Sequence, residues 1–157
     1  MMGAAKLDAG TYEEVEADST ATGQAAIVVA IVAVAQAIGA SGHGMNGILA
    51  GLIAAFFGWL VWSGVTYLIG DKVLGGTATW GEMLRTIGFA QSPGVFYFLA
   101  IIPGVGWIIR FAVAIWILVA GIIAIRQALD FGTGKAILTA VLGWLAVIIP
   151  LALLRML

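Results

Sequence analysis

Long runs of apolar residues are the feature that most constrains the fold of this chain. Four of them cover residues 24–40, 47–70, 107–125 and 136–154, and a shorter run covers 87–103. A helix that crosses a bilayer needs about 20 mainly apolar residues. Only 10% of the 157 residues are charged, whereas soluble domains have about a quarter. The sequence therefore predicts an all-α, polytopic membrane helix bundle with five spans, of which the third is short and kinked.

Residues 1–20 differ from the rest of the chain because they are polar and lack apolar periodicity. Their acidic side chains are those of Asp8, Glu13, Glu14, Glu16 and Asp18. No basic start is followed directly by an apolar core, so the segment does not have the form of a signal peptide. We expect a mobile, acidic cytoplasmic tail, followed by a transmembrane helical domain over residues 21–157. Such a tail is either simply solvated or docks on a basic surface of a partner.

Small residues recur at four-residue spacing in the second run, at Gly47, Gly51 and Ala55. Residues four apart lie on one face of a helix, and small side chains let helices approach closely in lipid. We expect this ridge to pack against another helix. The one histidine of the chain, His43, lies just before the ridge and between two glycines. A histidine in such a turn is more often a loop residue than a metal or pigment ligand.

Residues 79–90 combine a helix start with an amphipathic pattern. Thr79 and Glu82 have the spacing of a capping box, in which each residue binds the backbone N–H of the other. Glu82 and Arg85 fall on one helix face, where they can pair. The opposite face is apolar and carries Trp80, Met83, Leu84 and Ile87. The sequence predicts an amphipathic helix that lies in the membrane interface; the alternative is the solvated start of the next span.

A short apolar segment follows between two prolines. Ser92 as N-cap and Pro93 at the first helical position predict a helix start, and Pro103 ends that helix. At 1.5 Å per residue the helix is about 15 Å long, which is half of a bilayer core of about 30 Å. Two interpretations stay open. Residues 87–103 form a short, kinked third span, or residues 93–103 form a re-entrant half-helix.

Few ionisable residues lie within or beside the apolar runs. Arg110 is close to the start of its run, so its side chain can reach the headgroups, and we expect it to bind lipid headgroups rather than a transported solute. Arg126 and Asp130 are four residues apart and can pair, with each other or with Glu82 and Arg85 across the bundle. We expect these four residues to form an interaction or structural charge cluster.

The distribution of Lys and Arg near span ends predicts the orientation of the chain. Five spans with an internal N-terminus leave two basic residues outside, Arg110 and Arg155, and place five inside, which are Lys6, Lys72, Arg85, Arg126 and Lys135. With a re-entrant segment, Arg110 and Arg155 would lie inside and Arg126 and Lys135 outside. The count is again five basic residues inside and two outside. Both interpretations place the N-terminus in the cytoplasm.

The composition leaves little material for chemistry. There is no cysteine, and the one histidine and eight scattered acids do not form the pattern of a catalytic or metal site. We therefore predict no catalytic residue, no metal, no cofactor and no enzymatic activity. The net charge of −1 lacks the basic footprint of a nucleic-acid-binding protein. The expected partners are membrane lipids and other integral membrane proteins, or a second copy of the chain.

Several segments in the second half of the chain occur in an order that resembles the bacterial branch of the Yip (Ypt/Rab-interacting protein) family. They are residues 79–90 (TWGEMLRTIGFA), 92–94 (SPG), 103–106 (PGVG), 126–130 (RQALD), Ala120-Gly121 after Trp116, and Gly143-Trp144. The resemblance covers about residues 45–157. It implies five spans, a cytoplasmic N-terminus and a place in the bacterial inner membrane. Eukaryotic relatives take part in vesicle trafficking and contact small GTPases, but no catalytic residue and no GTPase-binding segment carries over to this chain.

Three function hypotheses follow. The first is a non-enzymatic membrane scaffold, adaptor or accessory subunit, because small-residue ridges suit helix packing. The second is a channel or transporter for an ion or small solute, because broken helices such as residues 93–106 often flank transport sites. The third is an accessory subunit of a photosynthetic or respiratory complex that contacts pigment or lipid through its tryptophans, which are Trp59, Trp62, Trp107 and Trp116.

Overall fold

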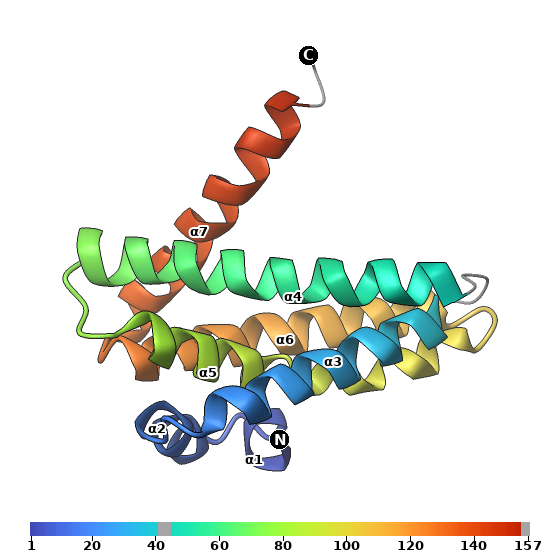
Figure 1. Cartoon of the computed structure of the whole chain (residues 1–157), viewed down its shortest axis with the longest axis horizontal. Coiled ribbons are helices and arrows are strands. Elements are labelled where there is room, and N and C mark those ends of the chain that lie inside the picture. Colours follow the sequence, from blue (N-terminus) through green and yellow to red (C-terminus); the bar gives the residue numbers. More distant parts are fainter. Residues whose placement is uncertain (41–44, 155–157) are drawn as a thin grey trace.

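The structure is a computed structural model that describes residues 1–40 and 45–154, and within these ranges every regular element is a helix (Figure 1). The all-α prediction is therefore confirmed. In chain order the elements are α1 (Met2–Ala5), α2 (Ala9–Ala17), α3 (Ala21–Gly39), α4 (Met45–Tyr67), the π-helix η1 (Leu68–Val73), α5 (Trp80–Ala90), the 3₁₀ helix η2 (Ser92–Ile101), α6 (Gly106–Ala128) and α7 (Thr133–Leu154).

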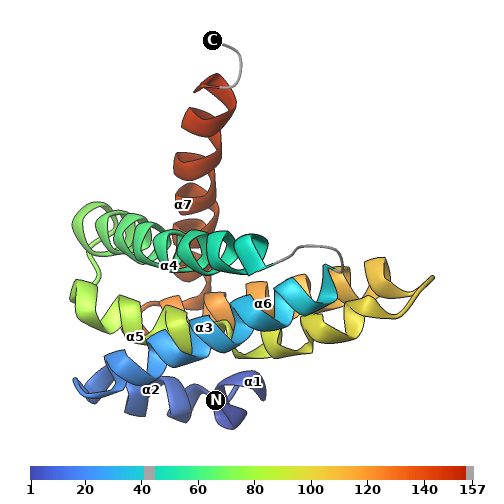
Figure 2. The same cartoon turned by 45° about the vertical axis from the view of Figure 1, so that its right-hand side comes forward.

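The long helices lie along one axis of the molecule. Among the described residues, three helices are long and apolar enough to cross a membrane, over Ala21–Gly39, Ile48–Val73 and Gly106–Ala128. They correspond to three of the predicted spans. α7 packs against α4 and α6 and then leaves the bundle at an angle (Figures 1 and 2). The four predicted full-length apolar runs are thus all helical. Three of them form the bundle, and α7 packs on it along part of its length.

The segment between α4 and α6 is an interrupted rod rather than one helix. α5 ends at Ala90, η2 follows from Ser92, and both pack against α6 and α3 (Figure 1). Ser92 does not cap the second piece as predicted: the residue at the N-cap is Gln91, and the Ser92 hydroxyl donates to the Phe89 carbonyl. Pro93 has no N–H to donate, so the α-helical ladder breaks here and continues in the tighter 3₁₀ form.

Close contact with α3 fixes the position of this rod. A Cβ added at Gly88 would lie 2.7 Å from the Ala25 Cβ, and one added at Gly94 would lie 2.5 Å from Val32 Cγ1. Only a residue without a Cβ fits at these two positions. Because α3 touches both α5 and η2 in this way, most of α5 and the start of η2 are buried in the bundle, whereas Phe96, Phe98 and Ile101 of η2 are exposed.

Residues 2–5 and 9–17 are helical and pack on the bundle, whereas the sequence predicted an aperiodic tail. α1 and α2 pack against α5, η2 and α6 (Figure 2). Tyr12 is fully buried, and its hydroxyl donates to the Ala4 carbonyl. Val15 is also buried in the same core. α2 is a short helix whose charged residues are all acidic, and Tyr12 and Val15 are its only large apolar residues. The apolar pattern is therefore too short to predict the helix from the sequence.

Two residues that the sequence singled out lie outside the described ranges, namely His43 in 41–44 and Arg155 in 155–157.

Candidate functional site

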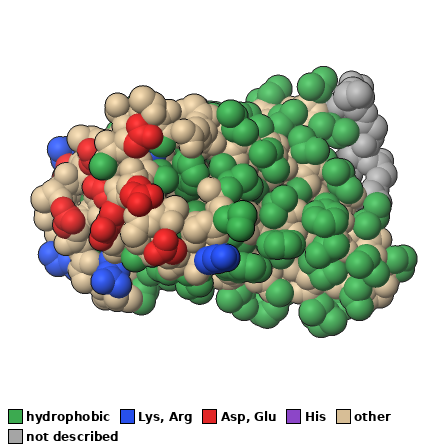
Figure 3. Space-filling view, turned by 90° about the horizontal axis from the view of Figure 1, so that it is seen from below, with side chains coloured by type: hydrophobic (Ala, Val, Ile, Leu, Met, Phe, Trp, Pro, Cys, Tyr) green, Lys and Arg blue, Asp and Glu red, His purple; other side chains and the backbone are tan. Residues whose placement is uncertain are grey.

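Acidic and basic side chains gather over one end of the molecule, whereas the rest of the same face is mostly apolar (Figure 3). Three segments meet at this charged end. We define the charged end as residues 8–18, which include α2, and as residues 71–82 and 126–135, which join helices. The Thr77 hydroxyl donates to the Asp130 carboxylate at 2.9 Å, and the Gln127 amide donates to the Glu13 carboxylate at 2.6 Å. These contacts join segments more than 50 residues apart in the chain.

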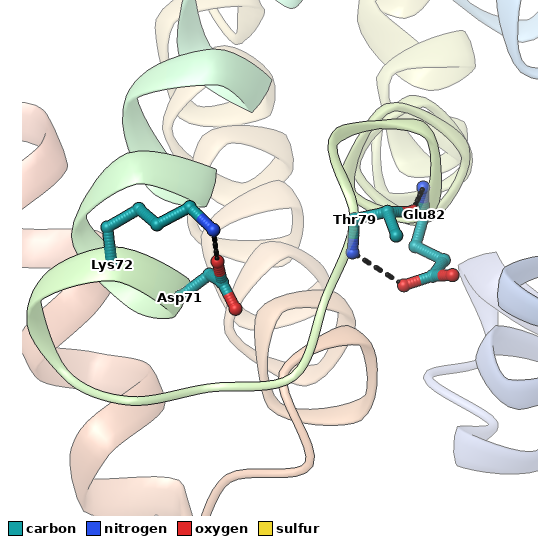
Figure 4. Close-up of polar contacts among 4 residues, drawn as sticks. All are labelled: Asp71, Lys72, Thr79 and Glu82. Atoms are coloured by element: carbon teal, nitrogen blue, oxygen red, sulfur yellow. Dashed lines mark hydrogen bonds and ion pairs between the residues drawn. The ribbon is translucent and has the colours of Figure 1, made fainter.

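The predicted capping box at the start of α5 is confirmed (Figure 4). The Thr79 N–H donates to Glu82 Oε2 at 2.7 Å, and the Glu82 N–H donates to Thr79 Oγ1 at 3.3 Å. Asp71 and Lys72 form an ion pair at 2.7 Å in the preceding turn (Figure 4). It is the one ion pair that the described residues form, so neither Glu82 with Arg85 nor Arg126 with Asp130 makes the pair that the sequence suggested.

Arg85 is the most unusual residue of the charged end, since it is a cation that is only 8% exposed. Its Nε donates to the Val15 carbonyl at 3.1 Å, and its Nη2 donates to the Glu16 carbonyl. Both carbonyls belong to the last turn of α2, where backbone acceptors lack helical partners and the helix dipole favours a positive charge. Arg85 therefore fastens α2 to α5.

This contact corrects the interpretation of α5 as an interfacial helix. The helix is amphipathic as predicted, but α2 covers the polar side that was expected to face water. The residues from Met83 to Ala90 are buried apart from Leu84, which is partly buried. α5 thus lies between other helices, and its polar face carries an intramolecular contact.

Glu16 lies where several charges of the cluster meet. Burial raises the pKa of its carboxyl to about 7, and repulsion from Glu82 and Asp130 acts in the same direction, whereas Arg85 lowers the pKa. Three of the four residues predicted as a charge cluster are therefore near one carboxyl. The fourth, Arg126, is exposed and does not appear among the charges that act on Glu16.

Arg110 lies apart from this group. Its Nη2 donates to the carbonyl of Gly39, the last residue of α3, at 2.6 Å, while the residue as a whole is exposed. It borders a cleft of about 430 Å³ that the turn around Pro103 and Gly104 and the side chain of Trp107 also line. Trp107 is 71% exposed. An exposed cation beside an exposed tryptophan suits the interface between lipid and water.

The three residues of the predicted packing ridge on α4 differ in their surroundings, and the burial of Gly47 lies outside what the structure describes. Gly51 is exposed, and a Cβ added there would meet no atom within 4 Å; the same holds for Gly58. Ala55 is partly buried against the core. Other positions of α4 expose large apolar side chains, namely Leu49, Ile53 and Phe57. We call the exposed surface of α4 with these three residues and the two glycines the outer face of α4; Gly58 lies at its edge, where it also lines a cavity that faces α3.

The tryptophans that were considered as a possible pigment contact have separate roles. Trp59 is buried and donates from its indole N–H to the Leu84 carbonyl at 2.9 Å. Trp116 stacks on Phe96 and donates to the Ala5 carbonyl at 2.8 Å. Trp62 lines cavities between helices. They do not form a single cluster with Trp107.

Sequence reasoning missed two functional features. One is the pair of carbonyls of Val15 and Glu16, because backbone acceptors leave no mark in a sequence. The other is Gln91, whose amide lies at the junction of α5 and η2 and lines two cavities; a polar residue within an apolar run was its signal. Across the described ranges no group of three or more His, Cys, Asp or Glu side chains could hold a metal ion.

An all-helical chain with long apolar helices and one charged end is a membrane protein by its fold. The model of the Yip1 domain matches residues 9–154. The chain belongs to the Yip1 domain family, which confirms the resemblance and extends it toward the N-terminus, into α2 and α3. No curated protein and no solved structure matches the chain.

Proposed function

We propose that the protein is a non-enzymatic adaptor, scaffold or accessory subunit that binds a helix of another membrane protein, or a second copy of itself, through the outer face of α4. The observation that carries the proposal is the open space at Gly51 and Gly58, on a helix that also exposes Leu49, Ile53 and Phe57. Glycine in the middle of a helix costs about 1 kcal/mol relative to alanine, and here the fold of the chain gains no contact in return.

Close packing against a partner helix would offset this unfavourable free energy. In lipid no hydrophobic force drives helices together, so association depends on close van der Waals packing, which small residues permit. The two glycines are seven residues apart, which is close to two helical turns, so both face the same side of α4. The exposed large side chains Leu49, Ile53 and Phe57 supply further apolar area on the adjoining part of the helix surface.

We further propose that the chain crosses the membrane five times. The α5–η2 rod has 11 α-helical and 10 3₁₀ residues, and at 1.5 and 2.0 Å per residue it reaches about 36 Å, enough for a core of about 30 Å. The rod runs beside α6 (Figure 1), which supports a crossing rather than a re-entrant turn.

The charged end would then face the cytoplasm, with the N-terminus, because Lys72, Arg85, Arg126 and Lys135 belong to the turns and helix ends that meet there. Arg110 would bind lipid headgroups on the opposite side. The family resemblance supports the bacterial inner membrane as the location.

Extraction in a mild detergent tests the adaptor proposal. The wild-type chain should co-purify with one defined membrane protein or as a defined oligomer, and Gly58→Leu and Gly51→Leu should each abolish that association without lowering the unfolding temperature of the monomer. Ala112→Leu, at an exposed alanine of α6, introduces the same leucine side chain elsewhere and should leave the association intact. A chain that extracts as a monomer and shows solute flux in liposomes would contradict the proposal.

Single-cysteine labelling tests the topology, and the native chain offers a clean background because it has no cysteine. Ser19→Cys and Val105→Cys, both at exposed positions, should react with a membrane-impermeant maleimide from opposite sides. Labelling of both from the same side would contradict the five-span arrangement.

A further inference from the structure

Two cavities are lined by residues of α4, α6 and α7. Their volumes are about 310 Å³ and about 480 Å³. They share Trp62 of α4, Leu118 and Ile122 of α6, and Ala140 and Trp144 of α7. Because five lining residues are common to both, the two cavities form one continuous space, which we call the crevice.

The lining of the crevice is apolar apart from its inner end. There the floor is formed by Ile87, Ala90 and Gln91, at the junction of α5 and η2. Gln91 lies in the middle of the α5–η2 rod, with 11 residues of α5 before it and 10 of η2 after it. The described lining of the two cavities contains no charged side chain.

Gln91 is partly buried, and its side chain makes no hydrogen bond to any other residue that the structure describes, although its backbone carbonyl accepts from Gly94 N–H. An amide that stays unpaired in an apolar medium is unfavourable. At the middle of the proposed span, lipid tails offer it no partner. The arrangement is that of a ligand pocket, with apolar and aromatic walls and a single convergent polar group.

The crevice thereby restricts the chemistry of its ligand. A phosphate or carboxylate would need a cation, and the described lining has none. A saturated hydrocarbon chain alone would leave the Gln91 amide unpaired. The combined volume falls in the range of small-molecule pockets, about 300–1,000 Å³.

We propose that the crevice binds one neutral, membrane-soluble molecule with a long hydrocarbon chain and one hydroxyl or carbonyl group, which hydrogen-bonds to the Gln91 amide. The chain of the ligand lies between Trp62 and Trp144, and it enters sideways from the bilayer past the splayed part of α7. This site is separate from the outer face of α4, so it adds a ligand to a protein whose proposed function is to bind a membrane partner.

Tryptophan quenching in the full-length protein in detergent micelles tests the site. The probes are a long-chain alcohol brominated along its chain and the brominated alkane of the same length. For the wild-type protein the alcohol should quench saturably with one molecule per chain, and Trp144→Phe should reduce the amplitude. Gln91→Leu should weaken the affinity for the alcohol about fivefold, as expected for the loss of one hydrogen bond of about 1 kcal/mol, and leave that for the alkane unchanged.

A second variant keeps the test independent of Gln91. Gly121 lines the crevice, and a Cβ added there meets no atom within 4 Å, so Gly121→Leu should fold normally and abolish saturable quenching by both probes. Gly51→Leu, on the outer face of α4 and with open space around its added Cβ, is the matched control and should leave quenching unchanged. Quenching that rises linearly with probe concentration, or an unchanged affinity of Gln91→Leu for the alcohol, would overturn the proposal, irrespective of whether a protein partner is found.

Discussion

The α5–η2 rod and α4 both carry glycines, yet the two sets of glycines have opposite surroundings. In the rod, Ala25 and Val32 of α3 occupy the space beside Gly88 and Gly94. On α4, Gly51 and Gly58 face open space. The first pair builds the bundle, and the second leaves a surface that the bundle does not use. Small residues in a membrane helix thus indicate close packing without saying whether the partner helix is inside or outside the molecule.

The largest effect is expected from a methyl group added inside the rod. Gly88→Ala would place its Cβ 2.7 Å from the Ala25 Cβ and 3.1 Å from the Trp59 indole nitrogen. Overpacking of this kind costs about 2–3 kcal/mol, more than the helix propensity of alanine returns. The unfolding temperature in detergent should fall clearly. Gly88→Ala should recover when combined with Ala25→Gly, and a single variant as stable as the wild type would show that α3 and α5 are not in close contact.

Replacement of the buried arginine should have the next largest effect. Arg85→Met removes two hydrogen bonds from a charged donor to the last turn of α2, a loss of about 2 kcal/mol. We expect α2 to detach while α3 to α6 stay folded. Hydrogen exchange followed by mass spectrometry would then show faster exchange over Ala9–Ala17 than over Trp80–Ala90. Equal protection of both segments would refute the role of Arg85 as the fastening of α2.

The apolar runs, the capping box at Thr79 and the break at Pro93 were predictable because each depends on neighbouring residues. α2 was not, since its burial depends on Arg85, 70 residues further along, and its sequence is mainly acidic. The contacts of the two arginines were also not predictable from neighbouring residues. Arg85 and Arg110 both donate to carbonyls at helix C-termini, of α2 and α3 respectively, and only one of them is buried. Contacts with backbone acceptors depend on the fold, not on a residue pattern.

A smaller effect is expected from pH, at the same α2 contact. The Glu16 pKa is raised by burial from 4.5 to about 7, so the docked α2 binds a proton more tightly than the undocked one. Docking is therefore strongest below pH 4.5 and weakens as the pH rises through about 7. The Glu16 carboxyl is only partly buried, so solvent screens its charge. The free energy of docking should therefore change by no more than about 1 kcal/mol. Exchange over Ala9–Ala17, corrected for the intrinsic rate, should increase with pH, and Glu16→Gln should remove the dependence.

The smallest change is expected at the open glycines of α4, and its sign is opposite to that at Gly88. Gly58→Ala meets no atom within 4 Å, so the substitution only restricts the unfolded chain and improves helix propensity, with a gain of about 0.5–1 kcal/mol. The purified monomer should therefore unfold at a slightly higher temperature. If a partner helix uses this face, the same methyl group should weaken the association while it stabilises the monomer. A decrease in the stability of the monomer would mean that the chain itself covers Gly58, and the contrast between α4 and the α5–η2 rod would disappear.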